Sequence, residues 1–226
     1  MSFISDLFAS SDNPKSLGAK FRNRRLHDFE ELFFKNFSPE QPLRILDVGG
    51  TGYFWENSSL PKLKHIEIVL LNLHEEEINH PTIRSVKGDA VAMPEFGDKS
   101  FDLVFSNSVI EHVYTLENQK KMADEIMRVG HKYFIQTPNR RFPVEAHYAL
   151  PYAQYMPKKF IYFLLTETKM SRLNKWKPAD AKQYLDEIRL LDEEQLRQLF
   201  PQAEIYKEKL LGLVKSFAAH NLGVNQ

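Results

Sequence analysis

Residues 44–52 read Arg-Ile-Leu-Asp-Val-Gly-Gly-Thr-Gly, an apolar strand that runs directly into a glycine-rich turn. Glycine lets the backbone turn tightly, and it lets a ligand approach the main chain without meeting a Cβ atom. In an open α/β sheet, such a turn lies at the carboxyl edge, where ligands bind. The stretch therefore predicts an α/β fold with a ligand site at the first strand-to-helix turn. A tight turn without a ligand is the simpler alternative.

Strand-sized apolar segments recur along the rest of the chain. We expect strands at 44–48, 65–71, 82–86, 101–105, 132–136, 203–210 and 213–219. A helix before the fifth strand has Thr115 as its N-cap and Gly130 at its end. A second helix begins with Asp192 and Gln195, which are spaced as a capping box. Alternating strands and helices imply a doubly wound, mostly parallel seven-stranded sheet that is covered on both faces, a Rossmann-like fold.

Two segments fall outside this alternation. Residues 1–37 are expected to form a stub and a helix, because apolar residues recur at helical spacing between 17 and 37. Residues 38–226 then form the main part of a single domain, with an insertion at 138–190 that is too long for an ordinary loop. The basic residues of the N-terminal helix predict a solvated face: Lys20, Arg22, Arg24 and Arg25.

The insertion is aromatic and basic. Residues 138–163 hold seven aromatic residues, and 138–182 hold nine basic against three acidic residues. Such a segment is either a lid over an apolar or ring-containing acceptor, or a small satellite core. Its basic residues could pair with an acidic group of the substrate or with the acidic segment 183–204.

Composition and charge exclude several classes of protein. Lys plus Arg and Asp plus Glu both number 30, which argues against a broad surface for nucleic acid or an anionic membrane. The absence of cysteine excludes disulfides, thiol catalysis and thiolate-ligated metal sites. No apolar run approaches the roughly 20 residues of a membrane-spanning helix, and residues 1–6 show no signal peptide. We therefore expect a cytoplasmic protein without a transmembrane segment.

Three kinds of nucleotide site compete for the glycine-rich turn. A phosphate-binding P-loop needs Lys followed by Ser or Thr after the glycines, whereas Tyr53 and Phe54 follow here. The dinucleotide fingerprint needs a third glycine, and Trp55 stands at that position. An adenosyl ligand without phosphates remains.

Residues 43–137, and less closely the closing strands, resemble the class I S-adenosylmethionine-dependent methyltransferases, in particular the small-molecule branch called type 11. The family loop reads Asp-x-Gly-x-Gly-x-Gly, and this one is one residue shorter. The resemblance implies S-adenosylmethionine as cofactor, bound by Asp47, Gly49, Gly50 and Gly52. A side chain at Gly50 is expected to block the cofactor while the fold survives.

The resemblance extends to three further turns. Asn72 stands where the family has an acidic residue that holds the ribose hydroxyls, and one of Glu75–Glu77 could substitute for it or the three could begin a solvated helix. Asp89 and Ala90 match the turn that binds the adenine. Residues 101–113, which include Asn107, match the fourth strand and the turn after it.

Two histidines are candidate catalytic residues. A hydroxyl acceptor benefits from a general base, and histidine suits neutral pH. His112 follows the fourth strand, at the edge where a substrate should arrive, and His147 lies among the tyrosines of the insertion. The alternative for His112 is that it binds a backbone carbonyl and shapes the wall of the pocket.

These residues predict methyl transfer from S-adenosylmethionine to a small molecule, at a hydroxyl oxygen. Two alternatives remain: transfer to a carbon of a lipid or isoprenoid ring, and a cofactor-binding partner protein without transferase activity. Asn107 is not followed by the Pro-Pro-aromatic turn of nucleic-acid base methylases, so no nucleic-acid partner is expected. No acidic trio marks a catechol-type metal site, and no metal is expected. The acceptor and the oligomeric state are left open.

Overall fold

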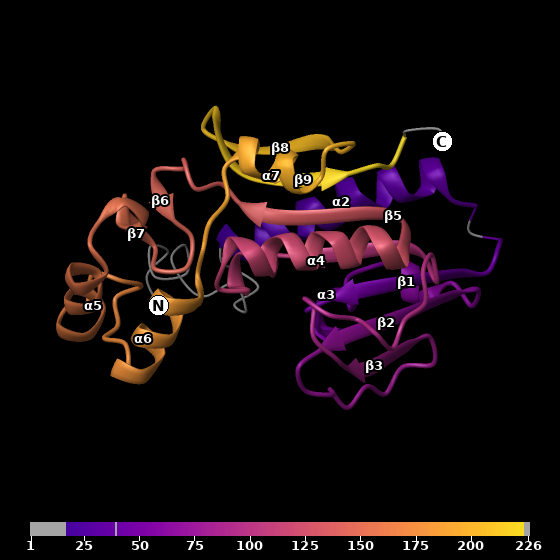
Figure 1. The fold of residues 1–226 in the computed structure, drawn as a ribbon, viewed down its shortest axis with the longest axis horizontal. Helices are drawn as coiled ribbons and strands as arrows, with labels where there is room; N and C mark the ends of the chain where they lie inside the picture. The colour runs from indigo at the N-terminus through magenta and orange to yellow at the C-terminus, as the bar shows by residue number, and fades with distance from the viewer. Residues whose placement is uncertain (1–16, 39, 224–226) are drawn as a thin grey trace.

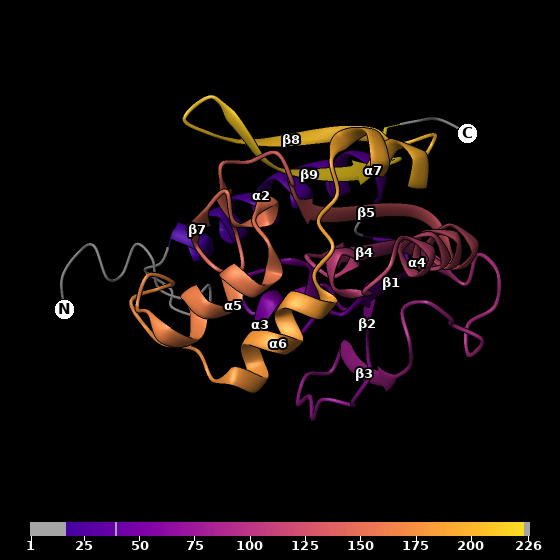
Figure 2. The ribbon, with the colours of Figure 1, turned by 60° about the vertical axis from the view of Figure 1, so that its left-hand side comes forward.

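The computed structural model describes residues 17–38 and 40–223, and its core is one seven-stranded sheet (Figure 1). The strand order is β3-β2-β1-β4-β5-β9-β8, which can be followed from bottom to top in Figure 2. The strands are β1 (Leu43–Val48), β2 (Ile66–Asn72), β3 (Ile83–Lys87), β4 (Phe101–Asn107), β5 (Gly130–Pro138), β8 (Glu204–Leu210) and β9 (Leu213–His220). β1 to β5 pair in parallel, and β9 is antiparallel to β5 and β8. The predicted fold class is confirmed.

The three helices that the sequence predicts, in 17–37, after Thr115 and after Asp192, are present, whereas within the described residues no helix joins β2 to β3 or β3 to β4. The helices of the structure are α2 (Leu17–Asn36), α3 (Gly52–Trp55), α4 (Leu116–Val129), α5 (Lys158–Glu167), α6 (Pro178–Glu187) and α7 (Glu193–Leu199), with the short 3-10 helices η1 (Leu60–Lys62), η2 (Ile110–His112) and η3 (Ala153–Tyr155). Thr115 caps α4 through the amide of Asn118, and Asp192 forms a capping box with Gln195 at α7. The described residues contain no helix that is long and apolar enough to cross a membrane.

Apolar side chains cover both faces of the sheet. On one face, α4 contributes Met122 and Ile126 to a core that also holds Phe200. On the other face, Phe29 of α2 and Trp55 of α3 are buried against the strands. Burial on both faces explains why the strands read as continuous apolar runs.

The prediction of a solvated basic face on α2 is wrong for Arg25. Its side chain is buried and donates to Glu208 Oε2 at 3.0 Å and to Asn107 Oδ1. Lys215 and Ser216 of β9 bind the same Glu208 oxygen. The closing hairpin therefore supplies a buried carboxylate that draws Arg25 inward, and a buried charge of this kind must be paired.

The insertion has a hydrophobic cluster of its own. It includes β6 (Val144–Glu145), β7 (Leu150–Pro151), α5 and α6, and lies beyond the arrowhead of β5 (Figure 1). Its cluster is Tyr148, Leu150, Ala153, Ile161, Leu165, Ala181 and Leu185. The described structure therefore contains the satellite core, while a lid movement stays a prediction.

Candidate functional site

The carboxyl ends of the parallel strands bring the predicted cofactor residues to one edge of the sheet. Asn72 at the end of β2 donates through Nδ2 to the Gly50 carbonyl at 2.7 Å. The Gly88 amide after β3 donates to the Asn72 carbonyl at 2.8 Å, and Ser106 of β4 donates to the Val48 carbonyl at 2.9 Å. These bonds link the carboxyl ends of β1, β2 and β4 and the turns after β1 and β3.

Two glycines of the first turn have no room for a side chain. Gly49 has a φ of 74°, and a Cβ there would lie 2.5 Å from Cγ2 of Val109. A Cβ on Gly50 would lie 1.7 Å from Oδ2 of Asp47. The expectation that a side chain at Gly50 spares the fold is therefore wrong, because it would displace a buried carboxylate.

Asp47 lies beneath this turn and is buried. Trp55 donates through Nε1 to its Oδ2 at 2.8 Å, while Oδ1 has no hydrogen-bond partner among the described residues. Burial raises the pKa of Asp47 to about 7, and the Trp55 hydrogen bond offsets only part of this. The Asp47 carboxylate thus packs against Gly50 of the turn and binds the indole of Trp55 in the core.

Replacing Asp47 by asparagine is expected to flatten the pH dependence of stability. The folded-state pKa lies above the usual 3.8, so between these values only the unfolded chain loses the Asp47 proton. Wild-type stability then falls as pH rises from about 4 to 7, by on the order of 4 kcal/mol from this group. Urea unfolding of both proteins across this range measures the difference. If the unfolding free energies of wild type and Asp47→Asn change with pH in parallel, the raised pKa of Asp47 is contradicted.

The segment after β2 does not form the solvated helix start that was one interpretation of Glu75–Glu77. Residues 75–79 are not helical. Glu76 accepts from the Gly52 amide at 3.2 Å through Oε2, and its own amide donates to Ser85. Glu76 is thus held at the glycine turn by contacts with two neighbouring segments.

The turns after β3 and β4 place the remaining predicted cofactor residues. Asp89 is exposed, and its Oδ1 accepts from the Val91 amide at 3.0 Å in a tight turn that includes Ala90. Asn107 accepts from the buried Arg25, a contact that the sequence analysis did not anticipate. The predicted residues lie on adjoining turns, and their contact with a cofactor stays a prediction.

The two candidate catalytic histidines meet at this edge. The rings of His112 and His147 are 4.9 Å apart at an interplanar angle of 84°. Nδ1 of His112 lies 2.8 Å from Glu187 Oε1, and Nδ1 of His147 lies 2.7 Å from Glu145 Oε1. Each ring thus has a carboxylate on one nitrogen, which leaves Nε2 as its second functional atom.

A third carboxylate completes this group. Glu111 is fully buried, and Thr137 donates to its Oε2 at 3.0 Å. Its Oε1 has no hydrogen-bond partner in the described part of the chain and lies 4.0 Å from Nε2 of His147. Burial lowers the pKa of His147, but the hydrogen bond and charge of Glu145, with the charge of Glu111, raise it above the ordinary value. We call Glu111, His112, Glu145, His147 and Glu187 the histidine–carboxylate cluster.

The acidic members of this cluster were not predicted from the sequence. Glu111 directly precedes His112, whereas Glu187 is 75 residues further along the chain than His112. The signal that could have found Glu145 is its spacing, two residues before His147. None exists for Glu187, because only the fold of the insertion brings α6 to η2.

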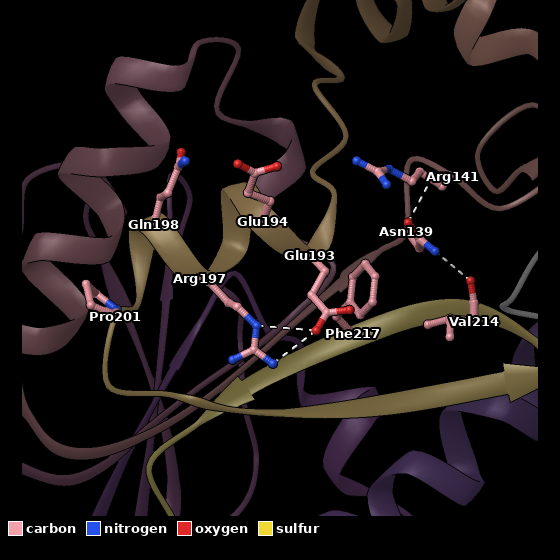
Figure 3. Close-up of a pocket in the computed structure, with 9 residues that line it drawn as sticks. All are labelled: Asn139, Arg141, Glu193, Glu194, Arg197, Gln198, Pro201, Val214 and Phe217. Carbon is pink, nitrogen blue, oxygen red and sulfur yellow. Dashed lines mark hydrogen bonds and ion pairs between the residues drawn. The ribbon is translucent and has the colours of Figure 1, made fainter.

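A cavity of about 610 Å³ lies elsewhere, between α7 and β9 (Figure 3). Glu193, Arg197 and Phe217 line it, and Arg197 donates to Glu193 at 3.0 Å within it. None of the predicted site residues lines this cavity. The candidate site is therefore the open sheet edge and not this cavity.

Residues 46–132 match the family model Methyltransf_11, described as a methyltransferase domain. Two uncharacterized proteins of Mycobacterium tuberculosis, MT1557 (strain CDC 1551) and Rv1509 (strain H37Rv), are each 31% identical to this chain over 71 residues. That match covers 31% of this chain and 23% of each relative. The chain therefore matches less than a quarter of the length of these curated relatives.

Solved structures share the fold. The CurJ carbon methyltransferase is similar with a TM-score of 0.56 and 12% identity, over 96% of this chain and 56% of that one. A presumed S-adenosylmethionine-dependent methyltransferase of Listeria monocytogenes is similar with a TM-score of 0.53 and 9% identity, over 89% of this chain and 97% of that one. At these identities the similarity to solved structures shows the fold alone. The family model is a separate match, to the sequence of residues 46–132. Residues 46–132 therefore match a methyltransferase domain, and the chain shares the fold of these solved methyltransferases.

Proposed function

We propose that this protein transfers the methyl group of S-adenosylmethionine to a hydroxyl oxygen of a small molecule. The observation that carries the proposal is the histidine–carboxylate cluster, whose residues Glu111 and His112 follow β4 in η2. The Val109 side chain lies against Gly49, and His112 follows three residues later in η2. His112 thus closely follows a side chain that packs against the turn that the family uses for its cofactor.

The residues at the sheet edge fit an adenosyl group. Val109 and Asp47 fill the space beside Gly49 and Gly50, and we assign the cofactor to the half-buried backbone that this turn leaves without side chains. The Asn72 side chain donates through Nδ2 to the Gly50 carbonyl, and in this proposal its Oδ1 accepts from a ribose hydroxyl. Asp89 uses one oxygen for the Val91 amide, and we assign the other to the adenine amino group. In this proposal, Ala90 and Asn107 flank the adenine and the methionine moiety.

When bound, the cofactor supplies an electrophilic methyl group on a sulfonium for a single in-line displacement. Most of the catalysis then comes from placing the acceptor oxygen about 3 Å from the methyl carbon. A hydroxyl must also lose its proton, and the cluster favours this loss through the Nε2 lone pairs of His112 and His147. Glu187 and Glu145 hold the two rings in orientation. His112, which is the more exposed of the two histidines, is the one that we place nearest to the acceptor.

An apolar acceptor is the second candidate, with transfer to a carbon of a lipid or isoprenoid ring. Exposed aromatic and apolar side chains on the insertion favour it: Tyr152, Tyr155, Met156, Phe160 and Phe163. A carbon acceptor would depend less on the cluster, so loss of the histidines distinguishes the two. The proposal also includes a cytoplasmic location and no nucleic-acid partner, which cell fractionation and a nucleic-acid binding assay would check.

The proposal is tested by incubating the protein with S-adenosylmethionine and small-molecule cell extract. Formation of S-adenosylhomocysteine that depends on the extract supports transfer, and mass spectrometry of the extract identifies the methylated atom. Cofactor binding without turnover on any fraction would favour a partner protein without transferase activity. His131→Ala serves as a control, since that side chain is exposed and lies outside the site.

A further inference from the structure

We infer that Glu111, His112 and His147 form a binding site for a divalent transition-metal ion. The inference rests on the proposed function only for what the ion does in the reaction, and binding is tested without turnover. One atom from each of the three side chains lies within 4.8 Å of the others. Two of the residues come from η2 and the third from the insertion, so the satellite core completes the site.

The spacing of these atoms suits an ion after a small inward movement. Zinc binds imidazole nitrogen at about 2.0–2.1 Å and carboxylate oxygen at about 2.0–2.2 Å. An ion at the centre of a triangle with 4.8 Å sides lies about 2.8 Å from each corner. Each side chain then has to move by about 0.8 Å at most, which small side-chain rotations provide.

Both histidines are held as metal-binding histidines are. A ligating histidine almost always donates its other ring N–H to a carboxylate or carbonyl, which fixes the tautomer and the ring orientation. Glu187 lies at hydrogen-bond distance from Nδ1 of His112 and Glu145 from Nδ1 of His147, so in the neutral rings Nε2 carries the lone pair that an ion would use. Each of the two neighbouring rings thus has its own carboxylate at Nδ1, which is the arrangement that orients a pair of metal-binding histidines.

Glu111 supplies the observation that points to a bound cation. A buried carboxylate oxygen without a partner is costly, and native structures rarely keep one. Thr137 satisfies Oε2, whereas Oε1 is buried, has no hydrogen-bond partner among the described residues and faces Nε2 of His147. An ion between Oε1 of Glu111 and Nε2 of His147 would give the unpartnered oxygen a ligand bond. The hydrogen bond from Thr137 to Oε2 orients the carboxylate for this.

Two imidazole nitrogens and one carboxylate oxygen select the class of ion. Imidazole suits zinc, iron, nickel and copper, whereas magnesium and calcium prefer ligand sets of oxygen alone. Three protein ligands also leave coordination positions open, as in catalytic metal sites. An acceptor oxygen at an open position would lose its O–H proton to water and attack the methyl carbon, while the methyl C–S bond of the sulfonium breaks and S-adenosylhomocysteine leaves. The ion would thus promote the loss of the hydroxyl proton, the role that the two Nε2 lone pairs have when no ion is bound.

Cobalt(II) titration of the full-length, chelator-treated protein tests the site. We expect one ion per chain and visible absorption bands of low-symmetry cobalt, and zinc should displace them. Glu111→Gln and His147→Gln should lose the bands at a cobalt concentration that saturates the wild type, while His131→Ala keeps them. Glu187→Gln, which removes only a support of the ring, should weaken binding by about 10–100-fold. Circular dichroism confirms that each variant is folded.

The outcomes separate this inference from the proposed function. If the stripped wild type takes up no ion, or if the folded His147→Gln and Glu111→Gln proteins bind it as tightly, the inference is overturned. Should the stripped enzyme methylate its acceptor at the full rate, the ion has no part in the reaction and the histidines act alone. Cobalt binding with the expected variant pattern but no turnover on any acceptor would uphold the metal site and contradict the proposed function.

Discussion

Replacing His112 by alanine is expected to slow the chemical step by about 10²–10⁴-fold while the affinity for S-adenosylmethionine stays nearly unchanged. His112 contributes one of the two basic nitrogens of the histidine–carboxylate cluster, 4.9 Å from the His147 ring. Its loss removes a proton acceptor in the free cluster and a ligand in the metal-bound one. Single-turnover kinetics with the acceptor found in extract measure the effect.

Two further variants sharpen this test. His112→Gln keeps a hydrogen-bonding side chain of similar reach but has no basic nitrogen, so it should lose rate nearly as far as alanine. His131→Ala is the matched control on an exposed histidine and should keep the wild-type rate. Full activity of His112→Gln would contradict a catalytic role for His112, and His147→Gln would then be measured. If both stay active, a carbon acceptor becomes the better proposal.

Gly50→Ala is expected to destabilise the fold strongly. Its Cβ would lie 1.7 Å from Oδ2 of Asp47, the oxygen that accepts from Trp55 in the core. Overpacking costs about 1–3 kcal/mol, and loss of the buried Trp55 hydrogen bond adds about 1–3 kcal/mol. For a chain of this size, a total of about 3 kcal/mol lowers Tm by roughly 6–12 °C. Differential scanning calorimetry gives the shift.

Gly52→Ala is the matched control in the same turn. There, the nearest atom to a new Cβ is Cδ1 of Ile78 at 2.9 Å, the end of a flexible side chain that can move. We therefore expect a loss of at most about 1 kcal/mol. Equal Tm values for Gly50→Ala and wild type would show that the Asp47 carboxylate does not hold the turn.

The parts of the fold that local sequence governs were predictable. The helix cap at Thr115 and the capping box at Asp192 depend on residues three apart, and both are present. The strands were predicted because burial on both faces leaves uninterrupted apolar runs in the sequence. Their observed bounds differ from the predicted ones by a few residues, as at β5, which extends from Gly130 to Pro138.

The parts that tertiary contacts decide were not predictable. Arg25 has the same local pattern as the exposed Arg24, and only Glu208, 183 residues away, draws it into the core. His147 has no marker as a partner of His112, because the insertion sets their distance. Glu187 likewise joins the site only through α6. A sequence pattern records neighbours along the chain, whereas this cluster depends on how the insertion folds back over the sheet edge.

Isothermal titration of the purified protein with S-adenosylmethionine tests the central claim most directly. Binding at one site per chain is expected, and Asp89→Ala should weaken it by about 1–3 kcal/mol, or roughly 5- to 150-fold, because the adenine amino group loses its acceptor. His131→Ala should bind as the wild type does. Absence of binding to the folded wild-type protein would contradict the account, and an unchanged affinity of Asp89→Ala would place the adenine elsewhere.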